Sequence, residues 1–68
     1  MIALQEAINR FLNGLPDETC MIFLARYYSM QPIREIAAAH SSTVGRVQMI
    51  LKRTKEKLRT FLKEEGFL

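Results

Sequence analysis

The sequence predicts an all-α fold, a small four-helix domain that contains a helix-turn-helix without a wing. Apolar residues recur at three- and four-residue steps along much of the chain, which is the spacing of amphipathic helices. A short Ala-rich segment is also followed by a turn of small polar residues and then by a long amphipathic segment rich in Lys and Arg. The 68 residues suffice for a single domain, residues 1–68, near the lower size limit for a hydrophobic core without disulfides or metal.

The first two helices are expected at residues 2–13 and 16–28. Gly14 ends the first helix, and Pro16 is expected at the first position of the second, where its missing N–H is harmless. Asp17 and Glu18 then favour the positive end of the helix dipole. The apolar face of the first helix is expected to comprise Leu4, Ile8, Phe11, Leu12 and Leu15. Phe11, Phe23, Tyr27 and Tyr28 are expected in the core because of their helical spacing.

The third and fourth helices are expected at residues 33–39 and 44–63. Pro32 restarts the chain as a helix, and the side chain of Thr43 is placed to cap the fourth helix after the polar turn. His40, the only histidine, is expected to be a turn or capping residue. A helical projection puts one set of residues of the fourth helix on the core: Val47, Ile50, Leu51, Thr54, Leu58 and Phe61. After Gly66 the chain either folds back on this helix or frays.

The positive charge is concentrated in the fourth helix. The chain has a net charge of +3, and residues 46–63 hold seven of its ten Lys and Arg residues with Glu56 as their only acid. The projection turns Met49 and Lys52 outward, with Arg46, Gln48 and Arg53 beside them. Cations that seek phosphates therefore lie next to groups that can contact base edges, which favours a polyanion partner, although solvated helix faces also look like this.

The same inventory argues against other functional classes. Cys20 is the only cysteine, so an internal disulfide is excluded, and a small hydrophobe in a cytoplasmic protein is the simpler interpretation. A single histidine excludes a two-histidine metal site and leaves no spare histidine beside a Ser-His-Asp triad, and the three glycines lie too far apart to form a phosphate-binding loop. We therefore expect no enzymatic activity, no cofactor, no small-molecule substrate and no membrane span.

Several segments together resemble region 4 of bacterial sigma-70 family factors, and most closely the extracytoplasmic-function group. The resemblance covers nearly the whole chain, and it rests on Leu15–Glu18, Phe23–Tyr28, Glu35–Ala37, Val47, Leu51–Thr54, Lys57–Leu58 and Leu62–Phe67. It implies recognition of the minus-35 promoter element by the last helix and docking on the β flap of RNA polymerase. An anti-sigma factor is a further possible partner. The DNA-binding residues that the resemblance and the charge pattern indicate are Arg34, Thr43, Arg46, Gln48, Met49, Lys52, Arg53 and Lys55.

The sequence departs from this family in the turn and in its length. The family has an apolar residue, Gly and another apolar residue where this chain has His40, Ser41 and Ser42, so a less well anchored turn is expected. Gln48 and Met49 also make the outer face less basic than is common. A helical protein-docking domain with little DNA contact is therefore the alternative function. Complete factors of this group also have region 2, so the chain is either a domain of a longer factor or a free-standing relative.

Overall fold

The computed structural model describes the backbone of residues 2–68 and the side chains of residues 3–68. Within that range the chain forms four α-helices: α1 (Ile2–Asn13), α2 (Asp17–Tyr27), α3 (Ile33–Ala39) and α4 (Val44–Glu64). No strand occurs in this part of the chain. The prediction of an all-α fold with four helices is therefore confirmed.

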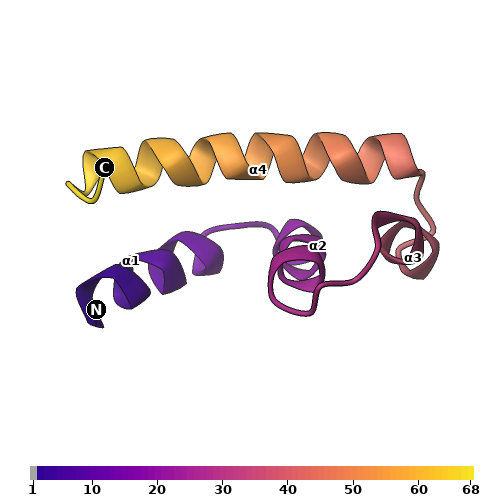
Figure 1. The fold of residues 1–68 in the computed structure, drawn as a ribbon, viewed down its shortest axis with the longest axis horizontal. Helices are drawn as coiled ribbons and strands as arrows, with labels where there is room; N and C mark the ends of the chain where they lie inside the picture. The colour runs from indigo at the N-terminus through magenta and orange to yellow at the C-terminus, as the bar shows by residue number, and fades with distance from the viewer. Residues whose placement is uncertain (1) are drawn as a thin grey trace.

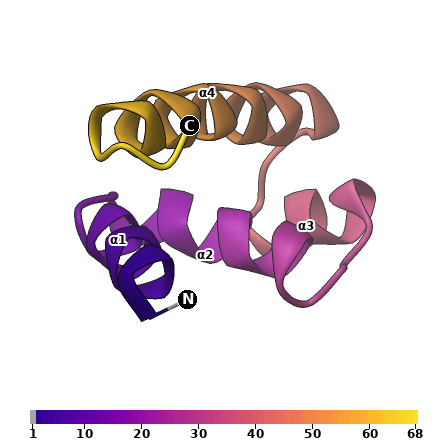
Figure 2. The same ribbon diagram turned by 60° about the vertical axis from the view of Figure 1, so that its left-hand side comes forward.

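The longest helix organises the others. α4 extends along one side of an elongated molecule of 36 × 18 × 18 Å, and α1, α2 and α3 lie opposite it in chain order (Figure 1). α2 crosses between α1 and α3, as the turned view shows (Figure 2). α4 contacts all three shorter helices. Its start lies beside α3 and its end lies beside α1 (Figure 1).

The core lies between α2, α3 and the first half of α4. Its buried residues are Ile22, Phe23, Ile36, Ala37, Val47 and Leu51. On α4, Val47, Leu51 and Thr54 are buried, and the other three residues of the predicted core face are half-buried. The Thr54 hydroxyl donates to the Ile50 carbonyl oxygen over 2.7 Å, which satisfies the one buried polar side chain on this face.

α1 packs on the C-terminal end of α4. Ala7 is fully buried, the Phe11 and Phe61 rings have centroids 5.5 Å apart, and Arg10 forms an ion pair of 2.7 Å with Glu65. Leu4, which belongs to the predicted apolar face of this helix, remains 39% exposed. Among the described side chains of α1, at residues 3–13, Ala7 is the fully buried one.

The start of α2 differs from its prediction, whereas its end at Tyr27 lies within one residue of the expected end at residue 28. Pro16 is the N-cap, with φ −56° and ψ 147°, rather than the first helical residue, and its carbonyl accepts from Cys20 N–H at 2.9 Å. The extended ψ of Pro16 means that the helix begins at Asp17. Tyr27 and Tyr28 are not core residues, since they are 46% and 83% exposed. Tyr27 covers one side of Phe23 at 4.8 Å, and Tyr28 is the C-cap, where the helical period ends.

The C-terminus takes the first of the two expected courses and folds back. Gly66 has φ 88°, which only glycine adopts freely, and its N–H donates to the Lys63 carbonyl oxygen at 3.2 Å. Phe67 N–H donates to the Leu62 carbonyl oxygen at 2.8 Å. This pair of bonds is a Schellman motif, and it satisfies carbonyl groups that the end of α4 would otherwise leave unpaired.

Candidate nucleic-acid interface

The turn between α3 and α4 is held by backbone hydrogen bonds. His40 is the C-cap of α3, which agrees with its predicted place in the turn. Ser42 N–H donates to the Ala37 carbonyl oxygen at 2.8 Å, and Ser41 N–H to that of Ala38 at 3.2 Å, so the turn is a second Schellman motif. Ser41 has φ 51°, in the left-handed region that favours glycine. The turn therefore has the same hydrogen bonds as a Schellman motif with glycine, but the backbone is strained at Ser41.

Thr43 sets the point at which α4 begins. Its Oγ1 accepts a hydrogen bond from Arg46 N–H at 3.1 Å, which is the predicted cap. The Thr43 carbonyl oxygen also accepts from Val47 N–H at 3.0 Å. Because Val47 is fully buried, the cap and the core together fix the direction in which the first turn of α4 leaves the domain.

All the residues expected to bind DNA are exposed. They lie on α3, in the turn and along the first half of α4, and they are Arg34, Thr43, Arg46, Gln48, Met49, Lys52, Arg53 and Lys55. The outward Met49 side chain is 48% exposed. The opposite side of the same helix segment is buried, so this half of α4 is anchored on one face and open on the other.

One flank of α4 forms a basic groove with the end of α2. Gln48, Lys52 and Lys55 line it together with Arg26 and Tyr27, around a volume of about 230 Å³. Lys55 Nζ lies 5.9 Å from the centre of the Tyr27 ring. Three cations thus converge beside the open face of α4, an arrangement that can hold a phosphate group.

Arg53 does not join this groove. It lies on the other flank, where a groove of about 490 Å³ runs between α1 and the second half of α4. That groove also contains Glu56, Lys57 and Glu64, so its charge is mixed rather than basic. The structure therefore brings Gln48, Lys52 and Lys55 together and leaves Arg53 apart from them.

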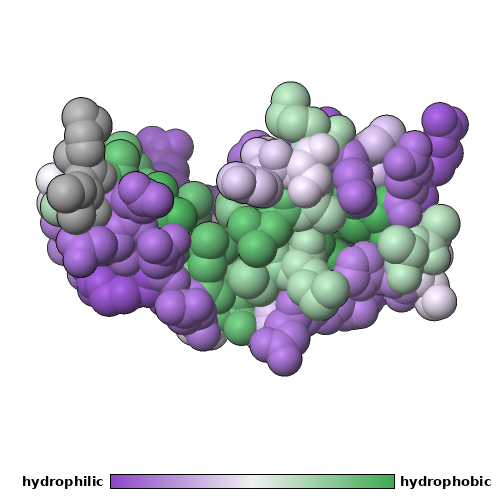
Figure 3. Space-filling model, turned by 90° about the horizontal axis from the view of Figure 1, so that it is seen from below, coloured by the Kyte–Doolittle hydropathy of each residue, from purple (hydrophilic) through white to green (hydrophobic). Residues whose placement is uncertain are grey.

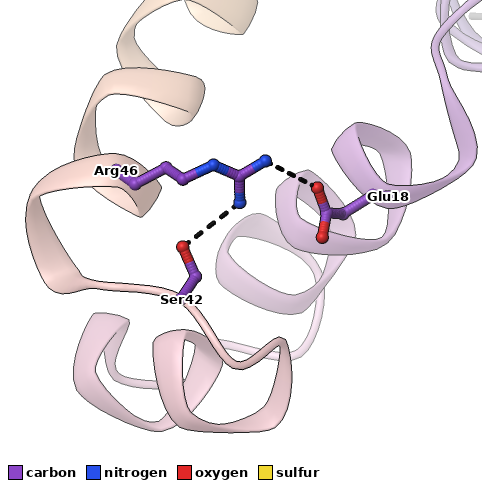
Figure 4. Close-up of polar contacts among 3 residues, drawn as sticks. All are labelled: Glu18, Ser42 and Arg46. Carbon is purple, nitrogen blue, oxygen red and sulfur yellow. Dashed lines mark hydrogen bonds and ion pairs between the residues drawn. The ribbon is translucent and has the colours of Figure 1, made fainter.

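Arg46 is held by a carboxylate from α2. Its Nη2 lies 2.9 Å from Glu18 Oε1, and its Nη1 donates to Ser42 Oγ at 3.2 Å (Figure 4). The hydrogen bond and the positive charge of Arg46 lower the pKa of the Glu18 carboxyl, with a smaller contribution from nearby His40. Glu18 is therefore ionised at neutral pH, and a negative charge stands beside the start of α4.

Arg26 and Glu18 are site residues that the sequence analysis missed. Arg26 lies near the end of α2, where its guanidinium donates to the Gln31 carbonyl oxygen at 3.0 Å. Glu18 lies in the first turn of α2, where an acidic residue is common, so the sequence gives no indication of its ion pair with Arg46. Both reach the interface only because α2 packs against α4, and the chain separates Glu18 from Arg46 by 28 residues.

No group of three His, Cys, Asp or Glu side chains that could hold a metal ion occurs among the described residues. None of the helices within residues 2–68 has the length and apolar character needed to cross a membrane. Three cations line the groove beside the open face of α4, and this is a positive feature of the described surface.

Comparison with known protein families agrees with this geometry. The family model for sigma-70, region 4 matches residues 11–60, which span α2, α3, the turn and most of α4. No curated protein and no solved structure gives a significant match. Because the family model covers more than half of the 68 residues, the chain belongs to the sigma-70 region 4 family of helix-turn-helix, DNA-binding transcription domains.

Proposed function

We propose that residues 1–68 act as the region 4 domain of an extracytoplasmic-function sigma factor that recognises the minus-35 element of promoter DNA. The observation that carries the proposal is the first half of α4, which is buried on one face and presents cations, an amide and a methionine on the other. A helix anchored in this way fits the major groove, which is about 12 Å wide.

The exposed side chains divide by chemistry. Lys52, Lys55 and Arg53 contact phosphates, and Arg34 does so from the start of α3. Gln48 and Met49 contact base edges, because an amide pairs with adenine and an apolar group with the thymine methyl. Thr43 orients the helix through its cap and lies near the DNA backbone. In this proposal the domain binds and positions, and the polymerase carries out the chemistry.

Salt dependence tests the DNA contact directly. Binding of a fluorescent duplex by the 68-residue chain should weaken steeply with salt, and Lys52→Ala or Arg53→Ala should each reduce the log–log slope by about 0.9. Lys63→Ala is the matched control, since Lys63 is an exposed cation in the last turn of the same helix. A weak duplex affinity that changes neither with salt nor with any of the three substitutions would exclude phosphate contact.

A second surface favours protein docking. On the face opposite α4, apolar surface gathers over the middle of the molecule, where α2 lies (Figure 3). Met21 on α2 is 60% exposed, Leu24 is 38% exposed, and Met30 in the following turn is 78% exposed. We propose that this surface docks on the β flap of the RNA polymerase core, and that an anti-sigma factor competes for it in the cytoplasm.

Polar substitution separates the two surfaces. Met21→Ser combined with Leu24→Ser should weaken binding to purified RNA polymerase core while leaving duplex affinity unchanged. Met49→Ser, an exposed methionine on α4, should leave the polymerase affinity unchanged. Equal polymerase affinity in all of these variants would contradict docking through α2. If the domain bound polymerase but no duplex, docking would be its main function.

A further inference from the structure

Arg46 differs from the other proposed DNA-binding cations in having an ionic partner. Within residues 2–68, the ion pairs are Arg10 with Glu65 and Arg46 with Glu18. Two of the Arg46 guanidinium's N–H donors are already used, one by Glu18 at 2.9 Å and one by Ser42 at 3.2 Å (Figure 4). Lys52, Arg53 and Lys55 have no carboxylate within ion-pair distance in this part of the chain.

We propose that Glu18 competes with DNA phosphate for the Arg46 guanidinium and so limits the affinity of the start of α4 for DNA of any sequence. The inference rests on the proposed function, because it assumes that duplex DNA lies against α4. It assigns a role to an acidic residue of α2, outside the helix-turn-helix itself. A carboxylate and a phosphate oxygen bind a guanidinium in the same forked geometry, so one can replace the other.

The exposure of the pair makes exchange feasible. The Arg46 and Glu18 side chains are 52% and 47% exposed, so a phosphate can approach without unfolding any helix. Exposed ion pairs contribute little net stability, because water and salt screen them and both side chains lose freedom. The pair is therefore weak enough to yield to a phosphate.

The negative charge of Glu18 also weakens DNA binding. When Arg46 turns to a phosphate, Glu18 is left unpaired at the edge of a polyanion, and it recruits a cation from solution. That uptake offsets a counterion released from the DNA. Replacing Glu18 with the neutral, isosteric Gln should therefore strengthen duplex binding and steepen its salt dependence.

The neighbouring acid provides a matched control. Asp17 precedes Glu18 in the first turn of α2, is exposed like it and carries the same charge, but it forms no ion pair within the described residues. Asp17→Asn therefore removes a similar charge from the same helix end while leaving the Arg46 contact in place. Any long-range attraction gained by removing one carboxylate is common to both variants.

The experiment compares duplex affinities of the wild type, Glu18→Gln, Asp17→Asn, Arg46→Gln and the Glu18→Gln/Arg46→Gln double variant. The probe is a fluorescent duplex of mixed sequence, titrated from about 50 to 200 mM salt, and circular dichroism confirms that each variant is folded. Glu18→Gln should bind up to about fivefold more tightly than the wild type, with a slope steeper by up to about 0.9. Asp17→Asn should gain less affinity than Glu18→Gln. When Arg46 is already replaced by Gln, adding Glu18→Gln should raise the affinity by no more than Asp17→Asn raises that of the wild type.

The outcomes separate this inference from the proposed function. If the wild type binds the duplex with a steep salt slope but Glu18→Gln equals Asp17→Asn, the competition is refuted and DNA binding stands. If Glu18→Gln binds more weakly than the wild type, Glu18 positions Arg46 for DNA rather than competing with it, which also overturns the inference. If no variant binds the duplex, the proposed function itself fails, and the competition fails with it.

Discussion

Ser41 occupies a backbone conformation that residues with a side chain seldom adopt. Its φ of 51° puts the turn of the helix-turn-helix in the left-handed region. The sequence showed a departure from the family turn at this position, and it predicted a less well anchored turn. The structure shows that the hydrogen bonds of a glycine turn are kept, with Ser42 N–H to the Ala37 carbonyl oxygen at 2.8 Å. The unusual turn sequence therefore strains the backbone at Ser41 but leaves the hydrogen bonds of the turn intact.

Replacing Ser41 with glycine should stabilise the domain. Ser41→Gly relieves a left-handed conformation that costs about 1 to 2 kcal/mol, and the added freedom of the unfolded chain returns about 0.5 to 1 kcal/mol of that. The net gain in the free energy of unfolding should be about 0.5 to 1 kcal/mol, measured by urea titration. Ser29→Gly is the control, because Ser29 is exposed without a positive φ and should lose stability instead. A loss for Ser41→Gly would show that the turn is not strained.

Glu18 should also contribute to the pH dependence of stability. Its carboxyl pKa is lowered in the folded protein by the hydrogen bond and charge of Arg46. A lowered pKa means that the contribution is present above the pKa of the unfolded chain and is lost as pH falls through the lower pKa of the folded protein. Between about pH 6 and pH 3, the wild type should therefore lose more thermal stability than Glu18→Gln. The difference should be small because the pair is exposed, and parallel losses in the two proteins would show that the pair adds no measurable stability.

At the scale of the helices, the sequence predicted what depends on local chemistry. Thr43 capping α4, Gly14 following α1, and Pro32 preceding α3 are signals written in neighbouring residues, and each helix lies where they indicate. Exposure depends instead on which helix lies opposite. Leu4 and Tyr28 have ordinary helical spacing, yet they are 39% and 83% exposed. Periodicity identifies an apolar face, but it does not show how far a partner helix covers it.

The Thr43 cap can be tested by truncation. Thr43→Ala removes the acceptor for Arg46 N–H and should cost about 1 kcal/mol of unfolding free energy. Thr43→Ser keeps the hydroxyl and should restore most of that loss. Thr60→Ala is the matched control, since Thr60 is an exposed threonine inside α4 where alanine is the better helix former. Equal effects at both threonines would argue that Thr43 does not cap the helix.

At the scale of the molecule, a six-residue core joins α2, α3 and α4, and α1 packs separately on the C-terminal end of α4. The sequence predicted the core face of α4 because the residues repeat regularly over that long helix. It did not predict the site residues that come from α2, because Glu18 and Arg26 join the interface only through the packing of α2 on α4. The spacing of apolar residues predicts each helix and its buried face separately. It does not predict which residues of two different helices lie side by side at the interface.

So small a core leaves little margin. A domain of this size has a stability of about 3 to 10 kcal/mol, and Ile36→Ala, at a fully buried site between α3 and α4, should cost about 2 to 5 kcal/mol. The melting temperature of that variant, measured by circular dichroism, should therefore fall well below that of the wild type. Met21→Ala shortens a side chain that is 60% exposed and should leave the melting curve nearly unchanged. An Ile36→Ala melting curve equal to that of the wild type would mean that stability comes from elsewhere.

Selection of bound duplexes from a randomised library measures whether the first half of α4 reads DNA sequence. The purified chain, at low and near-physiological salt, should enrich one short motif, and Lys52→Ala combined with Arg53→Ala should abolish that enrichment. Met49→Ala should alter the enriched bases more than the total affinity. Salt-sensitive binding without any enriched motif would contradict sequence reading by this domain alone.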